Sequence, residues 1–187
     1  MIYLKEMTND EESKIERLYI EAFPAGERKP FSMLLRMRKK QKANLLVIHE
    51  TKTGKAVGLA FFLIYKTDVL FDYFAVMPEC RIKGYGSVVL EKIKEYYSGR
   101  RIFGEVEVPD KNADDYNNQL RRMEFYKRND FKETGIVIDM NGCELQIMYV
   151  GEKPVSYEEY RIFIDKVFGF FGRKYARAIR LKYELNK

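Results

Sequence analysis

The sequence predicts a mixed α/β (α+β) fold, in which helices flank a mostly antiparallel central sheet of about six strands and a helical tail follows the sheet. Three observations support this prediction. Apolar residues first recur at helical spacing and then give way to β-branched and aromatic runs. A predicted strand leads through a glycine-containing loop into a predicted helix, and an Asn-Gly pair joins the last two predicted strands.

Two helices are predicted at the start of the chain. From Ile15 to Phe23 apolar residues recur at steps of three and four, directly after the acidic run 9–12, as in an amphipathic helix that begins with negative charge. Pro24 ends this helix. Residues 30–41 predict a second, shorter helix, and residues 25–29 form the loop between the two.

Residues 45–76 carry a β pattern. Turn segments separate runs of β-branched and aromatic residues, which predicts antiparallel strands over Leu45–Glu50, Ala56–Tyr65 and Val69–Val76. After a short loop, apolar residues at helical spacing predict a helix over 84–97, which the pair Ser98-Gly99 ends.

The second half of the chain continues this alternation of strand and helix. A strand is predicted over Arg101–Val108, and helical spacing follows over Asp114–Asn129. Two further strands, Thr134–Met140 and Glu144–Val150, flank the pair Asn141-Gly142, which is typical of a two-residue hairpin turn. Residues 1–150 are therefore expected to form one domain.

Residues 151–187 predict a basic, helical tail. Phe163 and Val167 share an apolar face, which is expected to pack on the domain or on a second copy in a homodimer. Lys and Arg outnumber Asp and Glu by 34 to 28, a net charge of +6, and the excess is concentrated after residue 172. We interpret this run as a solvated face; the alternative is an arm for nucleic acid, whose binding is not expected.

Composition argues against several classes of protein. No apolar run approaches the roughly 20 residues that cross a bilayer, so no membrane partner is expected and the protein is predicted to be cytoplasmic. Cys80 and Cys143 are expected to be reduced thiols. No His or Cys cluster has the spacing of metal ligands, so no metal is expected, and the single histidine, His49, is interpreted as structural.

The segment that carries the most chemical information is a strand, a loop with two glycines and the start of a helix. A helix N-terminus offers N–H donors and partial positive charge, and glycine lets a diphosphate approach the backbone. Val89 stands where a dinucleotide fingerprint needs its third glycine, and a Walker lysine is absent. The alternative is that the glycines only make a tight turn. The predicted phosphate-binding residues are Arg81, Ile82, Lys83, Gly84, Tyr85, Gly86 and Ser87.

The run from Arg81 to Gly86 resembles the cofactor loop of the GNAT superfamily of N-acetyltransferases, which reads Arg/Gln-x-x-Gly-x-Gly/Ala. A second GNAT motif, Tyr-x-x-x-Gly-Phe, is similar to residues 126–131, where Asp130 replaces the glycine. The order of predicted elements over residues 1–150 also resembles this family. The resemblance implies a GNAT-like acyl-CoA N-acyltransferase fold, acetyl-CoA as co-substrate and an amine as acceptor.

The resemblance also implies where the cofactor lies. In GNAT proteins the strand before the loop separates from its neighbour, and the pantetheine arm inserts there through backbone hydrogen bonds. By position this role falls on Phe74, Ala75 and Val76. A backbone N–H near Val76 would polarise the thioester carbonyl and hold the developing oxyanion, a contribution of about 2.7–4 kcal/mol where one such donor has been removed in other enzymes.

The second motif implies that Tyr126 donates a proton to the departing coenzyme A thiolate. The alternative is a core aromatic residue beside Phe125. The glutamate base of the histone-modifying branch falls at Leu70, which cannot accept a proton.

Two other carboxylates are candidates for the base. Glu105 and Glu107 alternate with valines, so both project from one face of their strand, and a paired site of this kind suits proton transfer. The alternative is that both form salt bridges with Arg121, Arg122 or tail residues.

The loop between the first two helices contributes to the acceptor pocket in GNAT folds, which makes Glu27 and Arg28 candidates for substrate binding, together with Asp72. Arg28 would pair with a carboxylate of the acceptor or be solvated. Two functions stay open. One is direct acetyl transfer to a primary amine of a small molecule or peptide; the other is a non-catalytic acyl-CoA-binding sensor or interaction module, favoured by Leu70 and Asp130.

Overall fold

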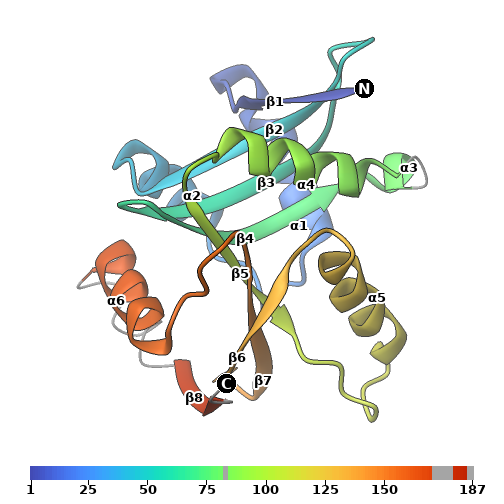
Figure 1. Cartoon of the computed structure of the whole chain (residues 1–187). Helices are drawn as coiled ribbons and strands as arrows, with labels where there is room; N and C mark the ends of the chain where they lie inside the picture. The colour runs from blue at the N-terminus through green and yellow to red at the C-terminus, as the bar shows by residue number, and fades with distance from the viewer. Residues whose placement is uncertain (82–83, 170–178, 185–187) are drawn as a thin grey trace. The chain divides into compact units, whose positions relative to one another are not determined.

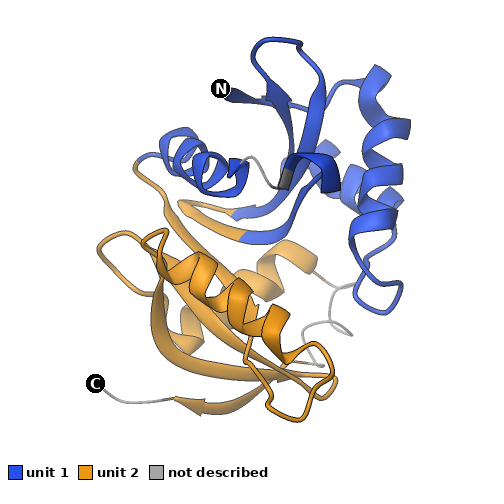
Figure 2. Cartoon of the chain, turned by 90° about the vertical axis from the view of Figure 1, so that its right-hand side faces the viewer, with its two compact units in different colours: residues 1–64, 71–98 blue, residues 65–70, 99–187 orange. Residues whose placement is uncertain are grey.

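The computed structural model describes residues 1–81, 84–169 and 179–184 (Figure 1). The chain divides into two compact units, each with its own strands and helices (Figure 2). Unit 1 comprises Met1–Ile64 and Phe71–Ser98, and unit 2 comprises Tyr65–Leu70 and Gly99–Lys187. Within the described ranges, no helix is long and apolar enough to span a membrane.

The described residues form eight strands in the order β1-β2-β3-β4-β5-β7-β6-β8. The pairs β1–β2, β2–β3, β5–β7, β7–β6 and β6–β8 are all antiparallel. Together with the helices between the strands, this order confirms the predicted mixed α/β class. The strands are β1 (Ile2–Glu6), β2 (Ala43–Glu50), β3 (Ala56–Tyr65), β4 (Asp68–Val76), β5 (Arg101–Glu107), β6 (Lys132–Met140), β7 (Cys143–Val150) and β8 (Ile179–Glu184).

The buried strand β3 lies in the core of unit 1. Residues 56–63 of β3 are all buried, the continuous apolar pattern of a strand with both faces covered. Helix α1 buries Ile15, Leu18 and Tyr19, the face that the spacing of three and four predicts. The helices of this unit are η1 (Asn9–Glu11), α1 (Glu12–Ala22), α2 (Phe31–Lys39), α3 (Pro78–Arg81) and α4 (Tyr85–Tyr96).

Unit 2 contains the helices α5 (Tyr116–Lys127) and α6 (Tyr157–Phe168) and the strands β5, β6, β7 and β8. The first residues of β4, 68–70, also belong to it. Ser156 caps α6: its hydroxyl accepts a hydrogen bond from the backbone N–H of Glu159, and the Glu159 carboxylate accepts one from the backbone N–H of Ser156. Phe163 of α6 is 1% exposed, and its ring centroid lies 5.1 Å from that of Phe103 on β5. Helix α6 therefore supplies part of the core of unit 2.

The hairpin and two strands show what the sequence pattern can and cannot predict. Asn141 and Gly142 adopt left-handed φ angles of 58° and 86°, which confirms the predicted turn. The sequence did not predict β1 or β8, because only Ile2 of β1 and Ile179 of β8 are buried and neither strand shows an alternating pattern.

Strand β8 corrects the prediction that the tail is wholly helical. The tail is helical over α6, as predicted, but Ile179–Glu184 is extended and pairs with β6. Cross-strand pairing decided this conformation, not local periodicity. The rest of that predicted tail, residues 170–178 and 185–187, lies outside the described residues. The domain boundary after residue 150 stays a prediction.

Candidate functional site

The predicted phosphate loop falls at the start of α4. Gly84 precedes the first turn of this helix with a left-handed φ of 67°, a conformation that favours glycine, and a Cβ there would meet no atom within 4 Å. Gly86 and Ser87 lie in the first turn, where N–H groups have no partner within the helix. Arg81 ends α3, and the predicted residues Ile82 and Lys83 lie outside the described residues.

Tyr85 opens α4 and is held by a residue that the sequence did not point to. Its hydroxyl donates a 2.9 Å hydrogen bond to Glu50, the last residue of β2. This contact ties the first turn of α4 to the sheet of unit 1. A glutamate at a strand end has no sequence pattern that would have identified it.

The end of β4 has a defined backbone orientation. The N–H of Met77 donates a 2.8 Å hydrogen bond to the carbonyl of Val57, and the carbonyl oxygen of Ala75 faces β3 at Gly58. No cis peptide occurs in the described chain, so the Ala75–Val76 peptide is trans and the Val76 N–H points to the opposite edge of β4. Ala75 and Val76 are each 7% exposed.

The predicted acceptor residue Asp72 has an internal partner. Lys29 Nζ lies 2.8 and 2.9 Å from the two carboxylate oxygens of Asp72, and both side chains are buried. The Tyr73 hydroxyl accepts a 3.0 Å hydrogen bond from the Lys29 N–H and donates a 2.8 Å bond to the carbonyl of Glu27. The loop between α1 and α2 is thereby fixed on β4.

The sequence did not identify Lys29 as a site residue, because its partner Asp72 is 43 residues away in the chain. Its carbonyl accepts a 3.0 Å hydrogen bond from the Tyr19 hydroxyl, and burial together with the hydrogen bond to Tyr73 raises the pKa of Tyr19. Glu27 is exposed, and Arg28 donates a 3.1 Å hydrogen bond to the carbonyl of Ile20. Arg28 is thus engaged with α1.

The two candidate bases, Glu105 and Glu107, stand two residues apart on β5 and have different partners. Glu105 accepts a 2.5 Å hydrogen bond from the hydroxyl of Tyr160 on α6, a contact that the sequence does not predict. Glu107 accepts a 3.0 Å bond from the Gln119 amide and forms an ion pair with Arg122. The alternative, that the two glutamates form salt bridges, therefore holds for the contact of Glu107 with Arg122.

Tyr126 lies in the last turn of α5 against two aromatic rings. Its ring centroid is 5.3 Å from that of Phe125 and 5.4 Å from that of Phe131. Burial raises the pKa of Tyr126 to about 12, and the charge of Arg122 opposes this shift. Asp130 adopts a left-handed φ of 69°, as the glycine of the second motif would. The phenol is protonated at neutral pH.

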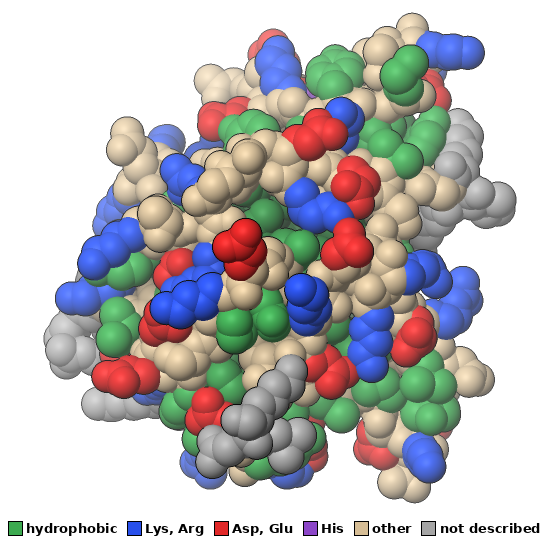
Figure 3. Space-filling view, viewed as in Figure 1, with side chains coloured by type: hydrophobic (Ala, Val, Ile, Leu, Met, Phe, Trp, Pro, Cys, Tyr) green, Lys and Arg blue, Asp and Glu red, His purple; other side chains and the backbone are tan. Residues whose placement is uncertain are grey.

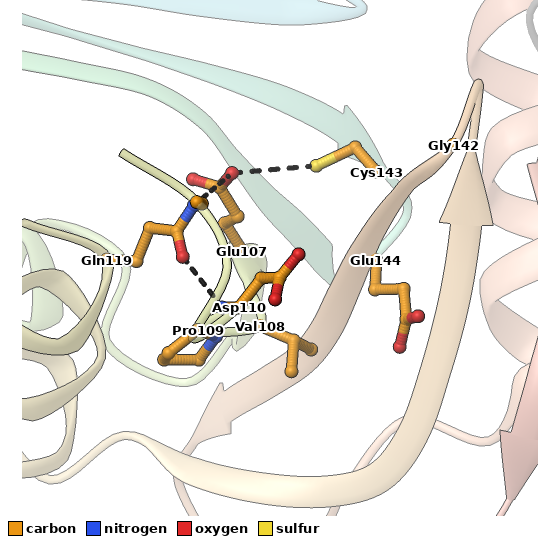
Figure 4. A pocket seen from close by; sticks show the side chains of 9 residues that line it. Glu107, Val108, Pro109, Asp110, Gln119, Gly142, Cys143 and Glu144 are labelled. Atoms are coloured by element: carbon orange, nitrogen blue, oxygen red, sulfur yellow. Dashed lines mark hydrogen bonds between the residues drawn. The ribbon is translucent and has the colours of Figure 1, made fainter. Parts of the chain in front are cut away.

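An open pocket of about 370 Å³ lies in unit 2 beside Glu107 (Figure 4). Asp110 and Glu144 add two further carboxylates to its lining, and the Cys143 thiol lies 3.9 Å from Glu107. Gln119 is 3% exposed, and its carbonyl accepts a 2.8 Å hydrogen bond from the N–H of Asp110. The lining of the pocket is acidic and contains no basic residue among those described.

Charged side chains of both signs are interspersed on one face of the molecule. Basic and acidic side chains alternate over the face shown in Figure 3, and Lys182 of β8 pairs with Glu144. In the described part of the chain, no group of three or more His, Cys, Asp or Glu side chains is arranged to hold a metal ion.

The predicted site residues fall into two sets. The cofactor residues 74–76 and 84–87 belong to unit 1, as do the acceptor candidates Glu27, Arg28 and Asp72. The candidate acid and bases, Tyr126, Glu105 and Glu107, belong to unit 2.

Comparison with known proteins identifies the family. Residues 41–133, about half of the chain, match the model of the acetyltransferase (GNAT) domain. No curated protein matches the chain. A protein of the GNAT acetyltransferase family from Bacteroides thetaiotaomicron has a similar structure, with a TM-score of 0.70 and 22% identity over 90% of this chain and 98% of that one.

Two further solved structures are named for their acceptors. A chimera of spermidine N-acetyltransferase SpeG from Vibrio cholerae and hSSAT has a TM-score of 0.62 and 17% identity over 80% of this chain and 94% of its own. The ribosomal-protein-S18-alanine N-acetyltransferase from Escherichia coli has a TM-score of 0.60 and 16% identity over 84% and 97%. At these identities the neighbours establish the fold, and the domain match establishes the family. The chain belongs to the GNAT family of acetyltransferase enzymes.

Proposed function

We propose that this enzyme transfers an acetyl group from acetyl-CoA directly to a primary amine of a small molecule or peptide, with both substrates bound in one ternary complex. The observation that carries the proposal is the backbone of unit 1: the Val76 N–H points away from β3, and α4 begins behind the left-handed Gly84. These features fit the thioester and the pyrophosphate of an acyl-CoA, respectively. The proposed chemistry needs no metal, and a cytoplasmic location stays a prediction.

In the proposed reaction the neutral amine attacks the thioester carbonyl, so that a C–N bond forms and the C–S bond breaks. The Val76 N–H stabilises the oxyanion. Tyr126 donates a hydrogen bond to the sulfur as the C–S bond breaks, which stabilises the departing thiolate. Because its pKa of about 12 lies above that of an ordinary thiol, about 8.5, full transfer is uphill and the hydrogen bond supplies most of the effect.

Glu105 or Glu107 takes the proton of the attacking amine in this proposal. Glu107 is the stronger candidate, because it lines the pocket of unit 2. Both carboxylates have partners in the folded chain: Tyr160 binds Glu105, and Gln119 and Arg122 bind Glu107. The variants Glu105→Gln and Glu107→Gln keep the shape of each side chain and remove the base, so the turnover of the two variants decides between them.

The acceptor is expected to be an amine that arrives as a cation. Glu107, Asp110 and Glu144 line one pocket; Glu107 pairs with Arg122 and Glu144 with Lys182, so the attraction of an ammonium group rests mainly on Asp110. The acceptors named for two structural neighbours, spermidine and the alanine of a ribosomal protein, are both amines. Both classes therefore belong in the first screen.

A non-catalytic acyl-CoA sensor is the second candidate, and one observation favours it. Leu70 occupies the position of a known glutamate base and is 2% exposed, so it can neither accept a proton nor orient a water. The test is the release of free coenzyme A from acetyl-CoA over a panel of polyamines, amino acid amides and peptides. Amine-dependent release supports the enzyme, and tight acetyl-CoA binding without release over the whole panel supports the sensor.

A further inference from the structure

Gly58 on β3 lies against the end of β4. A Cβ at this position would lie 2.5 Å from the carbonyl oxygen of Ala75, 2.7 Å from Cδ1 of Ile48 and 3.3 Å from Cα of Val76. The nearest of these atoms belongs to the backbone, which cannot turn aside as a side chain can. Space, not a left-handed φ angle, therefore requires glycine at residue 58.

The neighbouring residue on β3 reinforces this close approach. Ile48 pairs with Gly58 whereas His49 pairs with Ala56, so Val57 is an extra residue that forms a bulge. The carbonyl of Val57 accepts the 2.8 Å hydrogen bond from the N–H of Met77. The bulge and the glycine thus fix β4 on both sides of Val76.

We propose that Gly58 is a positioning residue for the oxyanion donor. The carbonyl of Ala75 and the N–H of Val76 belong to one planar trans peptide and point in opposite directions. By leaving room for the Ala75 carbonyl, Gly58 sets the direction of the Val76 N–H on the far edge of β4. This inference rests on the proposed function, in which that N–H holds the thioester oxygen.

A side chain at residue 58 must displace this peptide, and the N–H moves with the carbonyl because the group is rigid. The interaction of an oxyanion donor is stronger in the transition state than in the ground state. In Gly58→Ala we therefore expect kcat to fall by roughly 10²-fold while KM for acetyl-CoA changes little. A purely structural role would lower the melting temperature without this separation of kcat from KM.

The experiment reads the carbonyl directly and needs no acceptor. Isotope-edited infrared spectra of [1-¹³C]acetyl-CoA are recorded on the wild-type protein, Gly58→Ala, Ile48→Val and the double variant Ile48→Val/Gly58→Ala. Ile48→Val removes the side-chain atom that the new methyl group at residue 58 would touch, but it leaves the backbone contact with Ala75. The wild type and Ile48→Val are expected to lower the carbonyl stretching frequency on binding, and both glycine variants are expected to bind acetyl-CoA with a smaller shift.

Each contrary result has a separate meaning. An equal shift in Gly58→Ala overturns the inference, and so does a full shift in the double variant, because the Ile48 contact would then explain the effect. Loss of acetyl-CoA binding in both glycine variants, with Ile48→Val intact, assigns Gly58 to folding and also overturns it. A wild-type protein that does not bind acetyl-CoA refutes the proposed function instead, and binding without a shift refutes the role of Val76.

Discussion

At the scale of single residues, Tyr126 shows how packing and chemistry share one side chain. Its ring contacts Phe125 and Phe131, and burial raises the pKa of its phenol to about 12. The raised pKa keeps the phenol protonated at neutral pH, so that it can donate a hydrogen bond, but it also makes the phenol a weaker acid. The contribution of Tyr126 to the rate is therefore expected at the lower end of the usual range for acid–base catalysis.

Tyr126→Phe tests this role, because it keeps the ring and removes the hydroxyl. With a chemistry-limited amine, kcat should fall by roughly 10²-fold while acetyl-CoA affinity and melting temperature change little. Tyr116→Phe, at the other end of α5, is the matched control. Full turnover of Tyr126→Phe would reduce Tyr126 to a packing residue and leave protonation of the thiolate to water.

The sequence predicted single residues best where the backbone determines the residue type. Gly84 and the left-handed Asp130 follow from the two GNAT motifs. Sequence alone did not predict that Lys29 would pair with Asp72, or Tyr160 with Glu105, because these pairs are far apart in the chain and neither residue type signals its partner. The acceptor cannot be predicted for the same reason: it depends on contacts that only the folded chain creates.

At the scale of elements, α6 is joined to the strands of unit 2 by Arg101. The guanidinium of Arg101 lies 2.9 Å from Asp68 and 2.9 Å from Glu159, the residue that completes the cap of α6. The backbone N–H of Ser156 and the charge of Arg101 lower the pKa of Glu159, and burial opposes them. Ion pairs therefore attach helix α6 to the strands of unit 2.

The lowered pKa of Glu159 predicts a dependence of stability on pH. A carboxylate whose pKa is lower in the folded state contributes stability above its unfolded pKa, and this contribution is lost as the pH falls through the folded pKa. Glu159→Gln should lower the melting temperature at pH 7, and the difference should be lost as the pH falls through the lowered pKa of Glu159. Glu158→Gln is the control, since Glu158 is adjacent and does not cap the helix. A difference that persisted unchanged at low pH would contradict the ionic role.

Elements were predicted where apolar residues mark a buried face. Helix α4 and strand β3 have such faces, and their observed bounds are close to those predicted. Strands β1 and β8 have one buried residue each, so pairing with a neighbouring strand specifies them and the local sequence does not.

At the scale of the whole molecule, the chain forms two compact units, and the second includes the residues predicted as a tail. Tyr160, Phe163 and Ile164 of α6 are at most 1% exposed. We therefore expect a chain that ends at Gly151 to lose cooperative unfolding of unit 2, because the truncation removes these side chains and leaves a cavity in its core.

The point variants Phe163→Ala and Ile162→Ala test the same claim without truncation. Phe163→Ala should cost about 3–5 kcal/mol of unfolding free energy, whereas Ile162→Ala, on the 46% exposed neighbour, should cost less than about 1 kcal/mol. Denaturant unfolding measures both. Equal, small costs would favour the predicted boundary after residue 150, with α6 as a separable tail.

The central claim, that the loop before α4 binds the pyrophosphate of acetyl-CoA, is tested most directly by calorimetric titration of acetyl-CoA into Gly86→Glu. A glutamate in the first turn of a helix suits the helix dipole, so the variant should fold, but its charge repels an approaching diphosphate. Ser98→Glu adds the same charge beyond the other end of α4 and serves as the control. The dissociation constant should rise by at least roughly 10²-fold in Gly86→Glu and stay unchanged in Ser98→Glu. Wild-type affinity in a folded Gly86→Glu would contradict the account.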